Sequence, residues 1–234
     1  MGTPDFAVKI VDEVSLKHDV VLVVTQPDKL VGRKKELTPS AVKRWALDKN
    51  IPIFQPDNIK IDFDVILNQE CDIIITAAYG QIVPDIVLNH PKYKAINVHA
   101  SLLPKYRGGA PIQKALLNGD KETGISIIYM TSKMDAGDII MQKSLIIEES
   151  DYQDDLFDKL GILGASMINK CLEEIEKNLI KPVIQDEAKV TYAPNIKKED
   201  EKIDFNKTAF KIKCQVRALN PNPGCYFEID DKKI

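Results

Sequence analysis

The stretch AINVHASLLPKYRGGAPIQKALL, residues 95–117, decides the fold. Its first five residues, 95–99, are mostly apolar and predict a buried strand, and the pattern at 112–117 predicts a short helix. The residues between the two form a loop. The unit is therefore a strand that opens at its carboxyl end into a loop and then a helix.

Strands and helices alternate on both sides of this unit. The other strands are predicted at residues 20–25, 72–77, 124–130 and 136–147, and the other helices begin near Thr3 and Thr38 and cover 155–178 and 208–219. These strands are continuously apolar, which is typical of strands buried between two layers of helices. We therefore expect an α/β fold of the doubly wound, Rossmann-like kind, with a mostly parallel sheet and ligands bound where the strands end.

Composition and charge exclude several classes of protein. With 234 residues and 44% hydrophobic composition the chain can bury a core, and its 32 basic and 35 acidic side chains exclude a generally basic coat for nucleic acids, so any polyanion must meet a local patch. The four cysteines form no CxxC pair, which argues against zinc and against a secreted disulfide scaffold. Because no apolar run has the length of a membrane helix and the start does not resemble a signal peptide, we expect a soluble, cytoplasmic protein without membrane contact.

Asn97 and His99 are the first candidates for chemistry. They are two residues apart on the predicted strand, so their side chains point to the same side, near the carboxyl end where such sheets bind ligands. An amide and an imidazole held together there can stabilise an oxyanion and move protons, the two needs of acyl transfer. The alternative is a structural pair satisfied at the end of a strand, and these two residues alone do not decide between the two interpretations.

Asp135 lies in the run MDAGD, residues 134–138, just after a predicted strand. Gly137 permits a tight turn, and Asp135 can face the same crevice as His99, where it would orient the ring or polarise a water. Such a run alone is more often a turn than a site. Its weight comes from its combination with Asn97 and His99.

Together these motifs resemble the catalytic domain of the folate-dependent formyltransferases. The resemblance rests on Asn97-Val98-His99, on Ser101-Leu102-Leu103-Pro104, and on the runs RGGAPI at 107–112, TGIS at 123–126 and MDAGD at 134–138. Further segments resemble, in order and spacing, the branch of the family that acts on methionyl-tRNA: GTPDFA at 2–7, TQPD at 25–28, GRKK at 32–35, TPS at 38–40, TYA at 191–193 and RALNP at 217–221. The resemblance covers essentially the whole chain.

This resemblance implies that the formyl group of 10-formyltetrahydrofolate is transferred to the α-amino group of methionine on initiator tRNA, giving N-formylmethionyl-tRNA for translation initiation. The family pattern places its three catalytic positions on Asn97, His99 and Asp135. It places the folate-binding segment on Ser101, Leu102, Leu103 and Pro104. No Ser, Cys or Lys occupies an obvious nucleophile position, so we expect direct transfer without a covalent enzyme intermediate. We also expect a monomer that needs no metal.

Residues 28–50 carry seven basic and three acidic side chains, a local excess of four positive charges in a nearly balanced chain. The polar loop 28–37 lies between a strand and a helix and can reach outward. The resemblance implies that this loop enters the acceptor-stem region of the tRNA. Its tRNA-binding residues would be Arg33, Lys34 and Lys35, and Arg33 is suited to bidentate contact. The alternative is a solvated, lysine-rich loop.

Three parts are expected along the chain. They are a formyltransferase catalytic domain at 1–180, a linker at 181–202, and at 203–234 the opening fragment of a truncated C-terminal, OB-like β-barrel domain that helps hold tRNA. Family members have an apolar strand before the turn at residues 2–4, so we expect that this strand is missing here and that Met1 is an internal methionine. The run 225–229 predicts a strand after which the chain stops before any pairing strand.

Two other functions stay open. One is a sibling formyltransferase that acts on a sugar nucleotide or another small amine, against which the basic loop and the linker leading to residues 217–224 argue. The other is a non-catalytic remnant that binds folate or RNA. The intact set of Asn97, His99 and Asp135 argues against the remnant.

Overall fold

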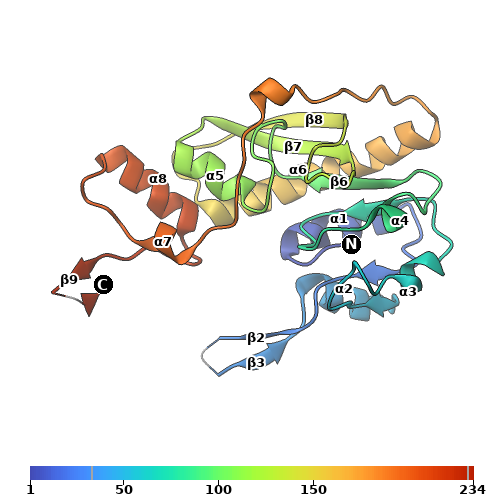
Figure 1. Ribbon diagram of the computed structural model, residues 1–234, viewed down its shortest axis with the longest axis horizontal. Helices are drawn as coiled ribbons and strands as arrows, with labels where there is room; N and C mark the ends of the chain where they lie inside the picture. The colour runs from blue at the N-terminus through green and yellow to red at the C-terminus, as the bar shows by residue number, and fades with distance from the viewer. Residues whose placement is uncertain (33, 231) are drawn as a thin grey trace.

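The computed structural model describes residues 1–32, 34–230 and 232–234. Its centre is a four-stranded sheet with the order β5-β6-β7-β8 (Figure 1). These strands are β5 (Ile74–Thr76), β6 (Ala95–His99), β7 (Glu122–Tyr129) and β8 (Ile139–Ile146). The described residues also form three strand pairs: β1 (Val23–Val24) with β4 (Ile53–Phe54), β2 (Lys29–Val31) with β3 (Glu36–Thr38), and β9 (Glu228–Ile229) with β10 (Lys232–Lys233).

The longer helices follow the predicted order. The helices are α1 (Asp5–Ser15), α2 (Ala41–Asp48), α3 (Asp64–Leu67), α4 (Asp85–Leu88), α5 (Pro111–Asn118), α6 (Gln153–Glu176), α7 (Lys198–Glu201) and α8 (Ala209–Leu219), with a 3-10 turn η1 (Glu187–Lys189). Ser40, two residues after the predicted start, caps α2 and accepts a hydrogen bond from the Lys43 amide. Thr3 does not cap α1, because its hydroxyl donates to the Tyr79 carbonyl at 3.0 Å. The one-turn helices were not predicted, since four residues are too few to show a helical period.

The α/β class is confirmed, but the sheet is mixed and not mostly parallel. β5 and β6 run parallel, whereas β6 and β7, and β7 and β8, run antiparallel. The short connection from β7 to β8 suits an antiparallel pair and leaves no room for the crossover that a parallel pair needs. The continuous apolar runs reflect burial on both faces of β6 and β7, and burial does not determine strand direction.

Helix α6 covers one face of β6 and leaves the other face to the site. A Cβ on Gly164 would lie 3.1 Å from Val98 Cγ1, so α6 packs directly on the side chain between the two candidate residues. Leu160, one turn earlier on α6, is fully buried in the same core. Because neighbouring residues of a strand point to opposite faces, Asn97 and His99 face away from α6.

Met1 and Gly2 lie between β1 and β5. The Gly2 amide donates to the Val24 carbonyl at 3.0 Å, and the Ala77 amide donates to the Met1 carbonyl at 3.0 Å. Beside Met1 there is a cavity of about 660 Å³, lined mainly by apolar residues of α1, β1 and β5. The Met1 amino group donates to the Ile75 carbonyl at 2.6 Å, and its burial lowers the pKa of this amine from 8.0 to about 5.

The buried amine of Met1 predicts how the stability of a polypeptide of these 234 residues depends on pH. Between about pH 5 and 8 the unfolded chain binds a proton at Met1 that the folded chain does not, so the free energy of unfolding rises with pH across this window. The slope is at most about 1.4 kcal/mol per pH unit. Urea unfolding at pH 5.5 and at pH 8 measures it, with the same chain acetylated at Met1 as control. Equal pH dependence of the two chains would contradict the prediction.

The segments predicted as the loop 28–37 and as the C-terminal strand both take part in antiparallel strand pairs. The predicted loop 28–37 contains the β2–β3 hairpin, which projects from the body (Figure 1). At the C-terminal end Lys232 of β10 pairs with Ile229 of β9, so the prediction that the chain stops before any pairing strand is wrong. The observed strands have only two residues each, so the five residues after 229 are enough for a pairing strand.

Candidate active site

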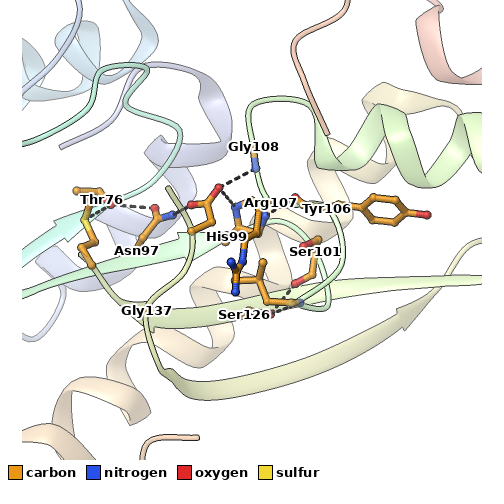
Figure 2. A network of polar contacts seen from close by, with 12 residues as sticks. Thr76, Asn97, His99, Ser101, Tyr106, Arg107, Gly108, Ser126 and Gly137 are labelled. Carbon is orange, nitrogen blue, oxygen red and sulfur yellow. Dashed lines mark hydrogen bonds and ion pairs between the residues drawn. The ribbon is translucent and has the colours of Figure 1, made fainter. Parts of the chain in front are cut away.

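The structure brings Asn97, His99 and Asp135 together at the carboxyl end of β6 (Figure 2). Asn97 Nδ2 donates to Asp135 Oδ1 at 3.3 Å, and His99 Nδ1 lies 3.6 Å from Asp135 Oδ2. The Gly108 amide donates to the same Oδ2 at 2.8 Å. Only 6% of the His99 side chain and 13% of the Asp135 side chain are exposed. Three residues chosen from two separate sequence motifs therefore form one cluster.

The His99 ring is oriented by the backbone. Its Nε2 lies 3.0 Å from the Tyr106 carbonyl, which can only accept, so Nε2 carries the proton and donates. In the neutral ring Nδ1 then keeps its lone pair and faces the Asp135 carboxylate. A proton taken up at Nδ1 would lie beside that carboxylate. The ring is thus arranged to act as a base at Nδ1.

Thr76 orients the amide of Asn97. Its Oγ1 lies 2.8 Å from Asn97 Oδ1 and can donate to it, which turns Nδ2 toward Asp135. An amide nitrogen has two hydrogens, and the one not given to Asp135 remains for a ligand. Sequence reasoning missed Thr76, although its position as the last residue of the neighbouring parallel strand was a usable signal.

Asp135 sits in a turn that needs a special backbone. Its φ is +51°, in the left-handed region that non-glycine residues rarely adopt. Two residues later, a Cβ on Gly137 would lie 1.7 Å from the Tyr129 carbonyl oxygen. Only glycine fits there, so the turn folds back tightly on the end of β7 and aims the Asp135 carboxylate at His99.

We expect Gly137→Ala to lower kcat at least about tenfold and to destabilise the fold by about 1–3 kcal/mol, because the added Cβ forces the turn off β7. Steady-state kinetics and thermal unfolding measure the two effects. Gly224→Ala is the control, since a Cβ at Gly224 would meet no atom within 4 Å and only its φ of +90° carries strain. An unchanged kcat in Gly137→Ala would show that the turn does not need this packing.

The cluster opens on a cavity of about 670 Å³, a volume typical of small-molecule sites. Its wall includes the three candidate residues, the loop 79–83, and Tyr192, Pro194 and Asn195. Tyr79 is the first residue of that loop, and within the described residues its buried hydroxyl has no hydrogen-bond partner. Burial raises the pKa of Tyr79 to about 12, so this hydroxyl stays protonated and can donate.

The structure does not bring the predicted folate-binding residues to the wall of this cavity. Ser101 and Leu103 are buried, Leu102 and Pro104 are half-buried, and none of the four lines the cavity. Ser126 Oγ donates to the Ser101 carbonyl at 2.6 Å and accepts from the Leu103 amide at 3.0 Å. The role of these four residues in folate binding stays a prediction.

Two of the predicted tRNA-binding residues, Lys34 and Lys35, lie apart from the cluster, between β2 and β3. Lys34 and Lys35 are exposed, and Arg33 lies outside the described residues. None of the described residues of this hairpin lines the cavity. Their role also stays a prediction.

Two further findings concern classes of site. Among the described residues, no group of three or more His, Cys, Asp or Glu side chains is placed to hold a metal ion. No helix in the described ranges combines the length and the apolar character needed to cross a membrane.

Comparisons with known proteins show the family of the chain. Residues 1–172 match the formyl transferase family and residues 195–234 match the formyl transferase C-terminal domain. The methionyl-tRNA formyltransferase of Staphylococcus epidermidis is 50% identical, and that of Staphylococcus aureus strain MW2 is 45% identical, each over 100% of this chain and 76% of the relative. The N-formyltransferase of Helicobacter canadensis, solved in complex with folinic acid and dTDP-3-aminofucose, has the same fold, with a TM-score of 0.77 at 23% identity over 100% of this chain and 84% of that one. This chain therefore belongs to the formyl transferase family and is an enzyme of the methionyl-tRNA formyltransferase type.

Proposed function

We propose that the enzyme transfers the formyl group of 10-formyltetrahydrofolate to the α-amino group of methionine on initiator tRNA, with N-formylmethionyl-tRNA as product. The observation that carries the proposal is the convergence of Asn97, His99 and Asp135 on one cavity. These groups are a donor, a base and a carboxylate, the set that acyl transfer to an amine uses. The substrate class comes from the names of the staphylococcal relatives.

The reaction makes one bond and breaks one. The neutral amine attacks the formyl carbon, a new carbon–nitrogen bond forms, and the bond from that carbon to N10 of the folate breaks. Between these events the formyl oxygen is anionic, and the free hydrogen of Asn97 Nδ2 donates to it. His99 Nδ1 takes the proton that the amine loses and gives it to N10, so no net proton is released.

Asp135 supports both Asn97 and His99 in this scheme. Its carboxylate accepts from Asn97 Nδ2 and lies beside His99 Nδ1, so it orients the donor and stabilises the protonated ring. Because the Gly108 amide also donates to it, the carboxylate keeps its place while His99 changes charge. Asp135 is therefore assigned to orientation and charge stabilisation, and His99 to proton transfer.

The folate is assigned to the cavity beside the cluster. The size of the cavity fits a heterocycle. Ser101, Leu102, Leu103 and Pro104 would act from outside the cavity wall, since Ser101 Oγ donates to the Lys105 carbonyl and so helps to fix the loop that carries Tyr106. The tRNA is assigned to the exposed β2–β3 hairpin, through Arg33, Lys34 and Lys35.

A formylation assay tests the function. The purified enzyme is given 10-formyltetrahydrofolate with methionyl initiator tRNA, with methionyl elongator tRNA, or with a dTDP-linked aminosugar. We expect product from the initiator tRNA alone. Formylation of the aminosugar but not of tRNA would replace the proposal with a sugar formyltransferase, and folate binding without transfer to any amine would indicate a non-catalytic protein.

A further inference from the structure

Gln185 is a buried residue between α6 and η1, and its side-chain amide joins the two loops of the site. Only 5% of the residue is exposed. Its Nε2 donates to the Asp135 carbonyl at 2.8 Å and to the Gly137 carbonyl at 2.7 Å. Its Oε1 accepts from Arg107 Nε at 3.1 Å and from Arg107 Nη2 at 2.9 Å. Both hydrogens and both lone pairs of the amide are therefore used.

The orientation of this amide is fixed by its partners. A guanidinium group only donates and a backbone carbonyl only accepts, so the oxygen must face Arg107 and the nitrogen must face the turn. The reversed amide would place hydrogens against the guanidinium and an oxygen against two carbonyls. Gln185 therefore stabilises a single arrangement of the two loops.

The turn that Gln185 binds depends on such support. The left-handed backbone of Asp135 is strained for a non-glycine residue and persists only where its surroundings hold it. The two carbonyls bound by Gln185 flank Ala136, so the amide spans the turn directly behind the Asp135 carboxylate. Without it, the backbone can relax and rotate the carboxylate away from His99.

Arg107 ties the other loop to the same amide. The residue is only 4% exposed, and its Nη2 also lies 2.8 Å from Glu187 Oε1, where its hydrogen bond lowers the pKa of that exposed carboxyl. The next residue, Gly108, donates its amide to the Asp135 carboxylate. Gln185 therefore links the residue before Gly108 to the backbone of Asp135, and closes a ring of contacts around the carboxylate.

The segment that carries Gln185 is itself fixed to the Arg107 loop. Downstream of Gln185, the Arg107 amide donates to the Thr191 carbonyl at 2.9 Å, and the Ala193 amide donates to the Arg107 carbonyl at 2.8 Å. A Cβ on Gly108 would lie 2.5 Å from the Ala193 carbonyl oxygen, so the two chains are in close contact. This stretch supports the site as well as leading to α8.

We propose that Gln185 is a positioning residue for formyl transfer, which holds the Asp135 carboxylate against His99 by clamping the 135–137 turn to Arg107. The kinetic part of this inference rests on the proposed function. The structural part, the place of the carboxylate beside the His99 ring, does not depend on which amine is formylated.

Gln185→Glu tests the clamp with a side chain of the same shape. Glutamate keeps an acceptor for Arg107, but it has no hydrogens for the two carbonyls of the turn. We expect kcat to fall about 10- to 100-fold, because the carboxylate is displaced, while KM for folate and for tRNA changes little. Gln185→Met, an uncharged side chain of similar length, should act in the same direction and serves if Gln185→Glu does not fold.

A nuclear magnetic resonance measurement separates positioning from general stability. The chain has three histidines, so the ¹⁵N signals of the His99 ring are identified by their absence in His99→Gln. In Gln185→Glu these signals should move toward their positions in Asp135→Asn. Glu187→Gln is the matched control: it changes the exposed partner of Arg107, and should leave both kcat and the His99 signals unchanged.

The outcomes are distinguishable. If the wild-type enzyme formylates methionyl-tRNA and Gln185→Glu keeps its kcat and its His99 signals, the positioning role is wrong. If the wild-type enzyme formylates no amine, the proposed function fails, and the His99 signals still decide whether Gln185 places the carboxylate.

Discussion

We expect His99→Ala to lower kcat by about 10²- to 10⁴-fold, the range that a placed acid–base group contributes. In the proposed scheme Nδ1 is the proton acceptor, because Nε2 is occupied by the Tyr106 carbonyl and Nδ1 faces Asp135. KM for folate should change little, since the loss lies in the transition state and not in ground-state binding. Single-turnover formylation at saturating folate measures the chemical step directly.

The control for this variant is His90→Ala. His90 is exposed, and its Nε2 lies 3.1 Å from the Gln69 carbonyl, in a part of the chain that does not line the cavity. Its replacement should leave kcat within about twofold. A His99→Ala enzyme with near-normal kcat would remove His99 from the chemistry and leave the oxyanion donor as the main catalytic group.

The candidate cluster of Asn97, His99 and Asp135 was accessible from the sequence because local geometry determines most of it. Asn97 and His99 lie on one strand, and the alternation of a strand places them on one side without any knowledge of the rest of the fold. Asp135 needed one more step, the combination of two motifs. Both motifs end a strand, and strand ends at one edge of a sheet meet in space.

The supporting contacts were not accessible in the same way. Thr76 is 21 residues from Asn97 in the chain, and Gln185 is 50 residues from Asp135. Neither belongs to a motif with its partner, and a buried Gln or Thr has the same local pattern whether it is structural or supports a site. Their roles depend on tertiary contacts that a single sequence does not encode in its spacing.

Strand direction was the main error of the fold prediction. The apolar runs of β6 and β7 are the pattern of strands with both faces covered, and parallel sheets are the usual source of such strands. Here the buried pair is antiparallel instead. The length of the β7–β8 connection held the information, because nine residues between two strands suit a hairpin better than a crossover.

Asn97→Ala should lower kcat by about 10²- to 10³-fold, which corresponds to about 2.7–4 kcal/mol for one preorganised donor to an oxyanion. The Thr76 hydroxyl fixes the amide, and Nδ2 keeps one hydrogen for the formyl oxygen, so no water or neighbouring group replaces this donor without reorganisation. Single-turnover formylation again measures the effect, and folate binding measured by fluorescence should be retained.

Thr76→Val makes this prediction sharper, because it removes the hydroxyl that orients Asn97 and keeps the shape of the side chain. If the donor acts by preorganisation, Thr76→Val should lower kcat by about tenfold, and its effect should disappear in an Asn97→Ala background. Asn89→Ala is the control, since that exposed amide only donates to the Asp85 carbonyl at the end of α4. Additive losses in the double variant would mean that Thr76 acts elsewhere. A small effect of Asn97→Ala would mean that other donors of the site stabilise the oxyanion.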